Sequence, residues 1–391
     1  MRKYLLILSF VFFTLCLISC GVSGNRTEYP GYGDIPENFV IGDYEIDEEV
    51  NLTCIAHNDN DYYDAWTNIV HEYHGAFNYY FNFYPLKTNK RLTIEAPKGI
   101  DFEISLLNEE KEIVYSNKPN AFGVCYLFPN WYSNYYTVKV KYLDKTTQEE
   151  VIEEFTIKDE LKLNIETAKV EKNIIDLMFV VDTTASMGDE LAYLKNEITD
   201  VVERVNSFNS CTVNVAILLY KDKGEIYETL YSEFTNNIEE QLNFLSNKIA
   251  YGGGDYEEAV DVAIEEAYAK SWSEEASTKL LIHIGDAPAH DENINDWYNS
   301  VLNLCSKGIK LITVASSGIN KKTEYLFRTM TLIGNGHYVA LTNDSGIGEE
   351  HMDPTTELDL TIENLDDCLV RLINSYHNGV KYDPVPIEKE K

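Results

Sequence analysis

A carboxylate and two hydroxyls follow a strongly apolar segment near the middle of the chain. Asp182, Thr184 and Ser186 come directly after residues 174–181, whose β-branched and apolar side chains predict a buried parallel strand. A helix is expected from about Gly188, because apolar residues then recur at spacings of three and four. Small oxygen ligands suit Mg²⁺ and Ca²⁺, and open α/β sheets bind ligands at the carboxyl ends of their strands. We therefore expect a divalent cation at this loop.

Two further segments carry candidate ligands. Three glycines precede Asp255, and Asp286 follows a second apolar strand over residues 280–284. The glycines would let the backbone pass close to an ion. A simpler interpretation stays open, because Ser186 and Asp255 both have spacings typical of helix N-caps, with Glu258 completing a capping box after Asp255. A carboxylate at the end of a buried strand is unfavourable unless paired or solvated, so we predict that Asp286 acts through water.

These three segments together resemble the metal-ion-dependent adhesion site of von Willebrand factor A domains. Asp182-x-Thr184-x-Ser186 resembles the family's Asp-x-Ser-x-Ser. Residues 252–259 resemble the Gly-Gly-Gly-Asp-x-Pro-Glu form of its second loop, found in the hemicentin-like and bacterial branches, but carry Tyr-Glu where x-Pro is usual. Residues 280–290 resemble the fourth strand and its terminal Asp. The resemblance covers roughly residues 170–378.

The resemblance implies a role for each site residue. Both hydroxyls of the first loop would bind the cation directly, and the carboxylates would act mostly through water. Asp255 falls where many relatives have a ligating Thr, so ligation by Asp255 would tighten cation binding and weaken the pull on an acidic partner. The predicted metal residues are therefore Asp182, Thr184, Ser186, Asp255 and Asp286. His290 and Asp291, in the loop after the fourth strand, are candidate partner contacts.

The composition of the whole chain limits its partners. The 391 residues carry 32 Lys and Arg against 65 Asp and Glu, a formal charge of −33. This charge argues against binding nucleic acid or anionic lipid through a basic patch. Hydrophobic residues make up 44% of the chain, enough for folded cores, and the length favours two domains. The seven Cys lack paired CxxC spacing, which argues against a zinc site, and a Cys54–Cys125 bridge stays an open possibility.

The N-terminus is typical of a targeting segment. Arg2 and Lys3 precede an apolar stretch that ends at Leu-Ile-Ser-Cys20, which resembles a bacterial lipobox. Residues 1–19 are predicted to be a lipoprotein signal peptide with Cys20 as the lipidated residue, followed by a flexible tether over residues 20–39. An ordinary secretory signal with a chance Cys is the alternative. The predicted location is the bacterial cell envelope, anchored in a membrane on the outer or periplasmic face.

Two patterns divide the rest of the chain. Short β-rich runs separated by turn signals in residues 40–168 predict an all-β, immunoglobulin-like sandwich, with a helix and an aromatic insertion in residues 58–84. Residues 170–378 alternate strands and helices, which predicts an α/β Rossmann-like sheet flanked by helices, the von Willebrand factor A fold. Residues 379–391 are a polar tail.

These features favour a cell-envelope lipoprotein that is not an enzyme. It would bind a protein or another acidic ligand through Mg²⁺ or Ca²⁺. One alternative is a structural component of an envelope complex, with the cation as a staple. Another is a hydrolase that uses Asp59, His71 and His74, which requires these side chains to converge.

Overall fold

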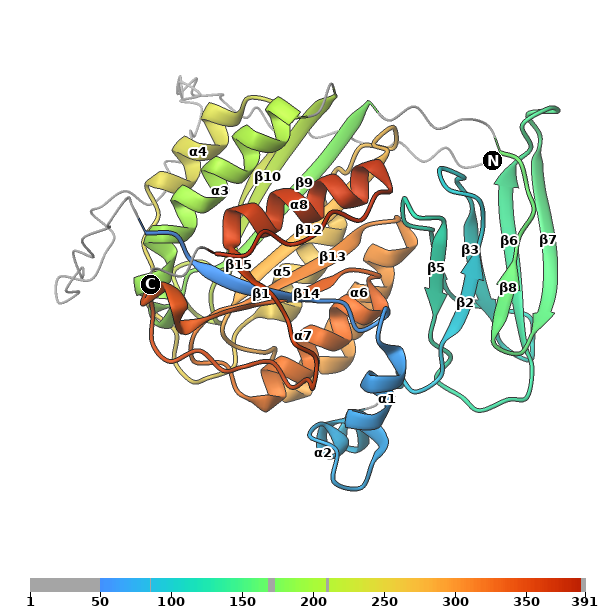
Figure 1. The fold of residues 1–391 in the computed structure, drawn as a ribbon, viewed down its shortest axis with the longest axis horizontal. Helices are drawn as coiled ribbons and strands as arrows, with labels where there is room; N and C mark the ends of the chain where they lie inside the picture. The colour runs from blue at the N-terminus through green and yellow to red at the C-terminus, as the bar shows by residue number, and fades with distance from the viewer. Residues whose placement is uncertain (1–49, 85, 168–172, 209–210, 388–391) are drawn as a thin grey trace, which may run out of the picture. The chain divides into compact units, whose positions relative to one another are not determined.

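The computed structural model describes residues 50–84, 86–167, 173–208 and 211–387 (Figure 1). The predicted signal peptide, the tether and the lipidation site Cys20 lie outside the described residues. Within the described ranges, no helix is both long enough and apolar enough to cross a membrane.

An eight-stranded sheet forms the centre of the C-terminal region, in the order β11-β10-β9-β12-β13-β14-β1-β15. The five neighbours from β10 to β14 run parallel to one another. The buried apolar runs of the sequence form these central strands, as expected for a sheet covered on both faces. The strands are β1 (Thr53–His57), β9 (Ile174–Asp182), β10 (Thr212–Tyr220), β11 (Thr229–Thr235), β12 (Thr278–Gly285), β13 (Lys310–Ala315), β14 (His337–Leu341) and β15 (Ile362–Asn364).

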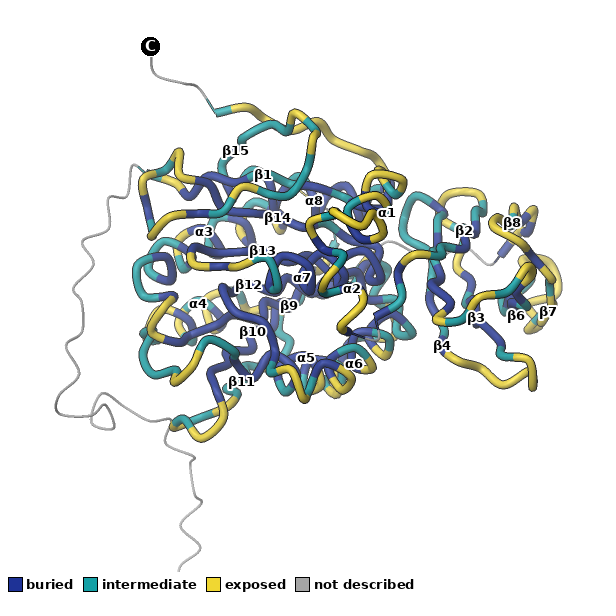
Figure 2. The backbone as a smooth tube through the Cα atoms, turned by 90° about the horizontal axis from the view of Figure 1, so that it is seen from below, coloured by how far each residue is buried: buried dark blue, intermediate teal, exposed yellow. Residues whose placement is uncertain are grey.

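Helices cover both faces of this sheet (Figure 1). Alternate side chains of β9 enter two different apolar cores: Phe179 packs with α3, α4 and α8, whereas Val180 packs with α5, α6 and α7. The arrangement confirms the predicted α/β sheet flanked by helices. Figure 2 shows the backbone of β9 and β12 as buried. The elements are α3 (Gly188–Phe208), α4 (Ile238–Ser246), α5 (Val260–Ala269), α6 (Ile294–Ser306), α7 (Lys321–Ile333), α8 (Leu365–Asn378) and the 3-10 turns η2 (Ala185–Met187), η3 (Asp291–Asn293) and η4 (Asn343–Ser345).

Two smaller sheets form the all-β region. Their strand orders are β5-β2-β8 and β4-β3-β6-β7. Ile94 of the first sheet and Val138 of the second are fully buried in one shared core, so the predicted all-β region is present. Most of its strands match the β-rich runs of the sequence. They are β2 (Leu92–Glu95), β3 (Glu103–Leu107), β4 (Ile113–Asn117), β5 (Val124–Leu127), β6 (Tyr136–Leu143), β7 (Glu150–Ile157) and β8 (Glu160–Lys162).

The start of the described chain differs from the expectation that residues 40–168 share one sandwich. Strand β1 pairs antiparallel with β14 and β15 and so belongs to the large sheet. The helices α1 (Tyr63–His71) and α2 (Asn78–Phe83) follow it and pack into the core of the α5–α7 face. Asp59 fixes this segment, because both of its carboxylate oxygens accept hydrogen bonds from the buried Arg328 of α7, at 2.5 and 3.0 Å. The segment before residue 85 is therefore part of the α/β body.

The fold also bears on two alternatives that the sequence left open, the Cys54–Cys125 bridge and the hydrolase site. Cys54 is in β1 and Cys125 is in β5, and both are free and buried. Asp59 is bonded to Arg328, whereas His71 and His74 are exposed at and beyond the end of α1. The convergence that a hydrolase site would require is therefore not found in these three side chains.

Candidate metal centre at the carboxyl edge of the parallel sheet

Three neighbouring strands end together at one edge of the large sheet. In the ladder, Tyr220 at the end of β10 pairs with Asp182 at the end of β9, and Ile284 of β12 pairs with Val181. A side-chain carbon added to Gly285 would lie 3.3 Å from the Asp182 Cβ. Parallel pairing thus brings the loop after each strand to one place, at the edge where open α/β sheets bind ligands.

The first loop presents its hydroxyls to carboxylates. One oxygen of Asp182 accepts hydrogen bonds from the backbone N–H of Thr184, at 2.9 Å, and from its hydroxyl, at 2.7 Å. The hydroxyl oxygens of Thr184 and Ser186 are 3.2 Å apart. Ser186 is exposed, and its nearby hydroxyl lowers the pKa of Asp286. The two hydroxyls therefore lie between the carboxylates of Asp182 and Asp286.

The glycine loop lies directly against the first loop. The backbone N–H of Ala185 donates to the carbonyl of Gly252, at 3.0 Å. Gly253 has a φ of +87°, and a side-chain carbon there would lie 3.1 Å from Glu258 Oε1 and 3.3 Å from Thr184 Cβ. Glycine is needed at this position both for the left-handed backbone and for the close approach.

Glu258 turns toward the first loop instead of capping a helix. Its side chain is 3% exposed, its Oε1 lies beside Gly253 and Thr184, and its Oε2 has no hydrogen-bond partner. Helix α5 begins at Val260 after the N-cap residue Ala259, and no side chain caps it. The alternative in which Asp255 and Glu258 form a capping box is therefore wrong.

A fourth carboxylate approaches from α3. Glu190 is fully buried, and its Oε1 accepts a hydrogen bond from the backbone N–H of Ser317, at 2.9 Å, and lies 2.8 Å from His351 Nε2. Its charge raises the pKa of Asp286, which places the two carboxylates near each other. Glu190 therefore adds negative charge behind the loops.

The electrostatics of this cluster favour a bound cation. Burial raises the pKa of Asp182 to about 6 and that of Asp286, with help from the Asp182 charge, to about 7. Lys221 is the cation that moderates the Asp182 shift, and its ammonium donates to the carbonyls of Thr183 and Tyr251. Each of the four carboxylates keeps one buried oxygen without a hydrogen-bond partner, which is rare in folded proteins. These oxygens are Asp182 Oδ2, Glu190 Oε2, Glu258 Oε2 and Asp286 Oδ1.

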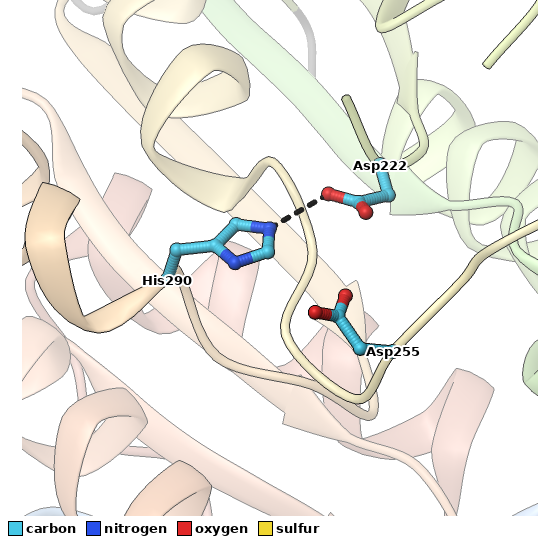
Figure 3. Close-up of side chains that lie close together, drawn as sticks. All are labelled: Asp222, Asp255 and His290. Carbon is cyan, nitrogen blue, oxygen red and sulfur yellow. Dashed lines mark hydrogen bonds and ion pairs between the residues drawn. The ribbon is translucent and has the colours of Figure 1, made fainter. Parts of the chain in front are cut away.

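A second cluster of possible metal-ligating side chains lies on the neighbouring loops (Figure 3). In the described parts of the chain, Asp222, Asp255 and His290 are the one trio of His, Cys, Asp or Glu whose ligand atoms all lie within 4.8 Å of one another. His290 Nε2 is 2.8 Å from Asp222 Oδ1, so this pair is already satisfied by a hydrogen bond. Asp255 is exposed. The charge of Asp222 raises the pKa of Glu258, so the two groups are neighbours.

The structure thus divides the predicted site residues. It gathers Asp182, Thr184, Ser186 and Asp286, and it places Asp255 with Asp222 and His290. Whether any of them binds a metal stays a prediction. Of the two predicted partner contacts, Asp291 is engaged by Tyr84, at 2.5 Å, and by Lys322, at 2.6 Å. The sequence analysis missed Glu190 and took Glu258 only for a capping residue.

Comparisons with known proteins identify the α/β region. The family model "von Willebrand factor type A domain" matches residues 176–350. The chain is 26% identical over 183 residues to the alpha-protein kinase vwkA of Dictyostelium discoideum, which covers 46% of this chain and 29% of that protein. It is 28% identical over 120 residues to a putative ariadne-like RING finger protein R811 of Acanthamoeba polyphaga mimivirus, 31% of this chain and 12% of that protein. The chain therefore spans less than a third of these relatives.

Solved structures also align with this region. The conserved hypothetical protein BatB from Bacteroides thetaiotaomicron aligns with 44% of this chain and 93% of its own, at 14% identity and a TM-score of 0.35. The pilus adhesin SpaC from Lactobacillus rhamnosus GG aligns with 52% of this chain and 30% of its own, at 11% identity and a TM-score of 0.34.

Proposed function

Residues 176–350 form a von Willebrand factor type A domain, and from this premise we propose that the chain binds a divalent cation at the edge of its large sheet and binds a partner through that cation. Domains of this family commonly bind a divalent metal ion, support protein interaction or adhesion in general, and are mostly not enzymes. The proposed partner is a protein or another acidic ligand, and the proposed role is not enzymatic.

The observation that carries this proposal is the set of buried, unpartnered carboxylate oxygens around two hydroxyls. Thr184 and Ser186 would bind the cation directly, and Asp182 and Asp286 would hold it through their charge. Ser186 is exposed, so the hydroxyl side of the site is open to a partner. Mg²⁺ and Ca²⁺ both prefer such oxygen ligands, and either would supply the charge that attracts an oxygen of the partner.

A pull-down from the native cell surface tests the proposal. The partner should bind in Mg²⁺ or Ca²⁺ and be lost when EDTA is added, and Asp182→Ala should reproduce that loss. Asp344→Ala, an exposed carboxylate in η4, is the matched control and should bind normally. Partner binding that survives both EDTA and Asp182→Ala would refute the cation-dependent mechanism.

A structural role for the ion is the second candidate. The cluster joins the loop after β9, the glycine loop and the loop after β12, so an ion there would hold three separate segments together. An ion that serves mainly as a staple should raise the melting temperature substantially, whereas an ion that serves mainly in adhesion should raise it much less. Calorimetric melting with and without the cation separates the two roles.

We also propose that the chain is anchored in the cell envelope through Cys20. The support is the sequence alone: Arg2 and Lys3, the apolar stretch after them, and the small residues before the cysteine. Labelling cells with a radioactive fatty acid should mark the wild-type protein and leave Cys20→Ala unmarked. Equal labelling of both proteins would contradict the proposed anchor.

A further inference from the structure

We infer that Glu258 is a ligand of the cation, in the role that the sequence alone assigned to Asp255. The inference rests on the proposed function, because it requires a cation at this edge of the sheet. It assigns to the glycine loop a charged ligand that is buried beside the first loop.

The position of Glu258 supports this role. Its side chain reaches from the chain before α5 toward the first loop, where a side-chain carbon added to Gly253 would lie 3.1 Å from Glu258 Oε1 and 3.3 Å from Thr184 Cβ. The backbone N–H of Glu258 donates to the carbonyl of Pro288, at 3.0 Å, which fixes the residue against the loop after β12. Its Oε1 lies close to Gly253, where an added side-chain carbon would be 3.1 Å from it in a left-handed backbone. The side chain is thus held at the junction of all three loops.

The unused oxygen of Glu258 supports a ligand role over a structural one. Oε2 is buried and has no hydrogen-bond partner, and Glu258 as a whole is only 3% exposed. A buried carboxylate in a purely structural role would normally satisfy both of its oxygens. Ionised carboxylates cannot donate hydrogen bonds to one another, and a cation beside Asp182, Glu258 and Asp286 would satisfy all three without a proton.

Asp255 is the weaker candidate for the same role. It is exposed, and its carboxylate faces Asp222 and His290 (Figure 3). A solvated carboxylate can remain unpaired without penalty, whereas Glu258 cannot. The glycine loop therefore offers two carboxylates, of which the buried one is directed at Thr184.

A charged ligand at this place changes what the cation can do. The carboxylates of Asp182, Glu190, Glu258 and Asp286 together with the ammonium of Lys221 carry a formal charge of −4 + 1 = −3, when all are ionised. A bound divalent cation would change the formal charge of the site from −3 to −1. Such a site holds its cation tightly without a partner and exerts a weaker pull on an external carboxylate than a site with neutral ligands.

Calorimetric titration of the EDTA-treated full-length protein with MnCl₂ and MgCl₂ tests the assignment. Glu258→Gln keeps the size of the side chain but removes the charge, and it should weaken cation affinity by at least about tenfold. Glu258→Asp keeps the charge but shortens the side chain by one methylene group. It should weaken cation affinity, but less than Glu258→Gln does. Glu257→Gln is the matched control and should change affinity by less than about twofold, whereas Asp255→Asn tests the competing candidate and should weaken affinity less than Glu258→Gln does.

The outcomes separate the inference from the function on which it rests. Wild-type protein that binds no divalent cation would refute the proposed function itself. Wild-type protein that binds a cation while Glu258→Gln binds it equally well would overturn only the role of Glu258. A loss in Asp255→Asn as large as that in Glu258→Gln would also overturn it. The melting temperature of each cation-free variant shows whether a lower affinity reflects misfolding, because removal of a buried charge should leave that temperature equal or higher.

Discussion

At the scale of single residues, the buried carboxylates predict how the stability of the cation-free protein depends on pH. Burial raises the pKa of Asp182 to about 6 and the pKa of Asp286 to about 7, from an ordinary value of 3.8. Between pH 4 and pH 7 the folded state therefore binds more protons than the unfolded state, so the free energy of unfolding should fall as the pH rises. Denaturant unfolding at a series of pH values in EDTA measures this slope.

Addition of Mg²⁺ should reverse this trend, because the ion competes with protons for the same oxygens. Cation affinity should rise from about pH 6 to about pH 9, because burial raises the pKa of Asp182 to about 6, that of Asp286 to about 7 and that of Glu258 to about 9. Stability in EDTA that increases between pH 5 and pH 7 would contradict the account of these carboxylates. The Asp182→Asn variant should show a flatter slope, which serves as the control.

Local sequence was sufficient for some site residues and insufficient for others. Asp182 and Asp286 were predicted because each follows a strongly apolar strand, and parallel strands end at a common edge. Glu258 was missed as a site residue because the spacing of Asp255 and Glu258 fits a capping box, and local spacing cannot show which way the side chain turns. Its position inside the Gly-Gly-Gly-Asp-x-Pro-Glu pattern was the signal that pointed to the site. Glu190 carries no such signal, since it is one of many acidic residues on a helix.

At the scale of the elements, two of the three glycines of the second loop, Gly253 and Gly254, give a matched pair of variants. Gly253→Ala should lower both the stability and the cation affinity, because the added carbon meets Glu258 and Thr184 in a left-handed backbone. The expected loss of stability is about 1 kcal/mol or more. Gly254→Ala should have little effect, because nothing lies within 4 Å of the added carbon. Thermal melting and cation titration of both variants measure the difference, and equal effects would contradict the described packing of the loop.

The first described strand provides a second prediction at this scale. Asp59→Asn removes one of the two charged partners of the buried Arg328, the other being Glu324, and should destabilise the α/β body by about 1–3 kcal/mol. Asp61→Asn breaks only the more exposed ion pair with Lys381 and should cost less than about 1 kcal/mol. Chemical denaturation compares the two. Equal stabilities would contradict the assignment of this segment to the large sheet.

The strands and helices were mostly predictable, but the partners of β1 were not. Buried runs such as β9 and β13, and the recurring apolar spacing of α3, follow from local sequence. Strand β1 pairs Cys54 with Leu341, far along the chain, and nothing in its own five residues indicates which sheet it joins. Because β1 precedes the β-rich runs in the sequence, it was included in the sandwich predicted over residues 40–168. Long-range pairing of this kind depends on the whole fold.

At the scale of the whole molecule, the charge of −33 bears on the strength of cation binding. Negative surface charge attracts divalent ions over a distance of roughly the Debye length, about 8 Å at physiological ionic strength. The affinity for Mg²⁺ should therefore fall as NaCl rises from low to physiological concentration, even though the site itself is unchanged. Titrations at several salt concentrations measure this, with Asp182→Ala as the control for ions held only by the surface. Affinity independent of salt would contradict a contribution from the net charge.

The central claim is that one divalent cation binds where the loops after β9 and β12 meet the glycine loop. Calorimetric titration of the EDTA-treated protein with Mg²⁺ and Ca²⁺, beside the Asp182→Ala variant, tests it most directly. The account predicts a single saturable site in the wild-type protein and its loss in the variant. Absence of saturable binding in the wild-type protein, or equal binding in Asp182→Ala, would contradict it.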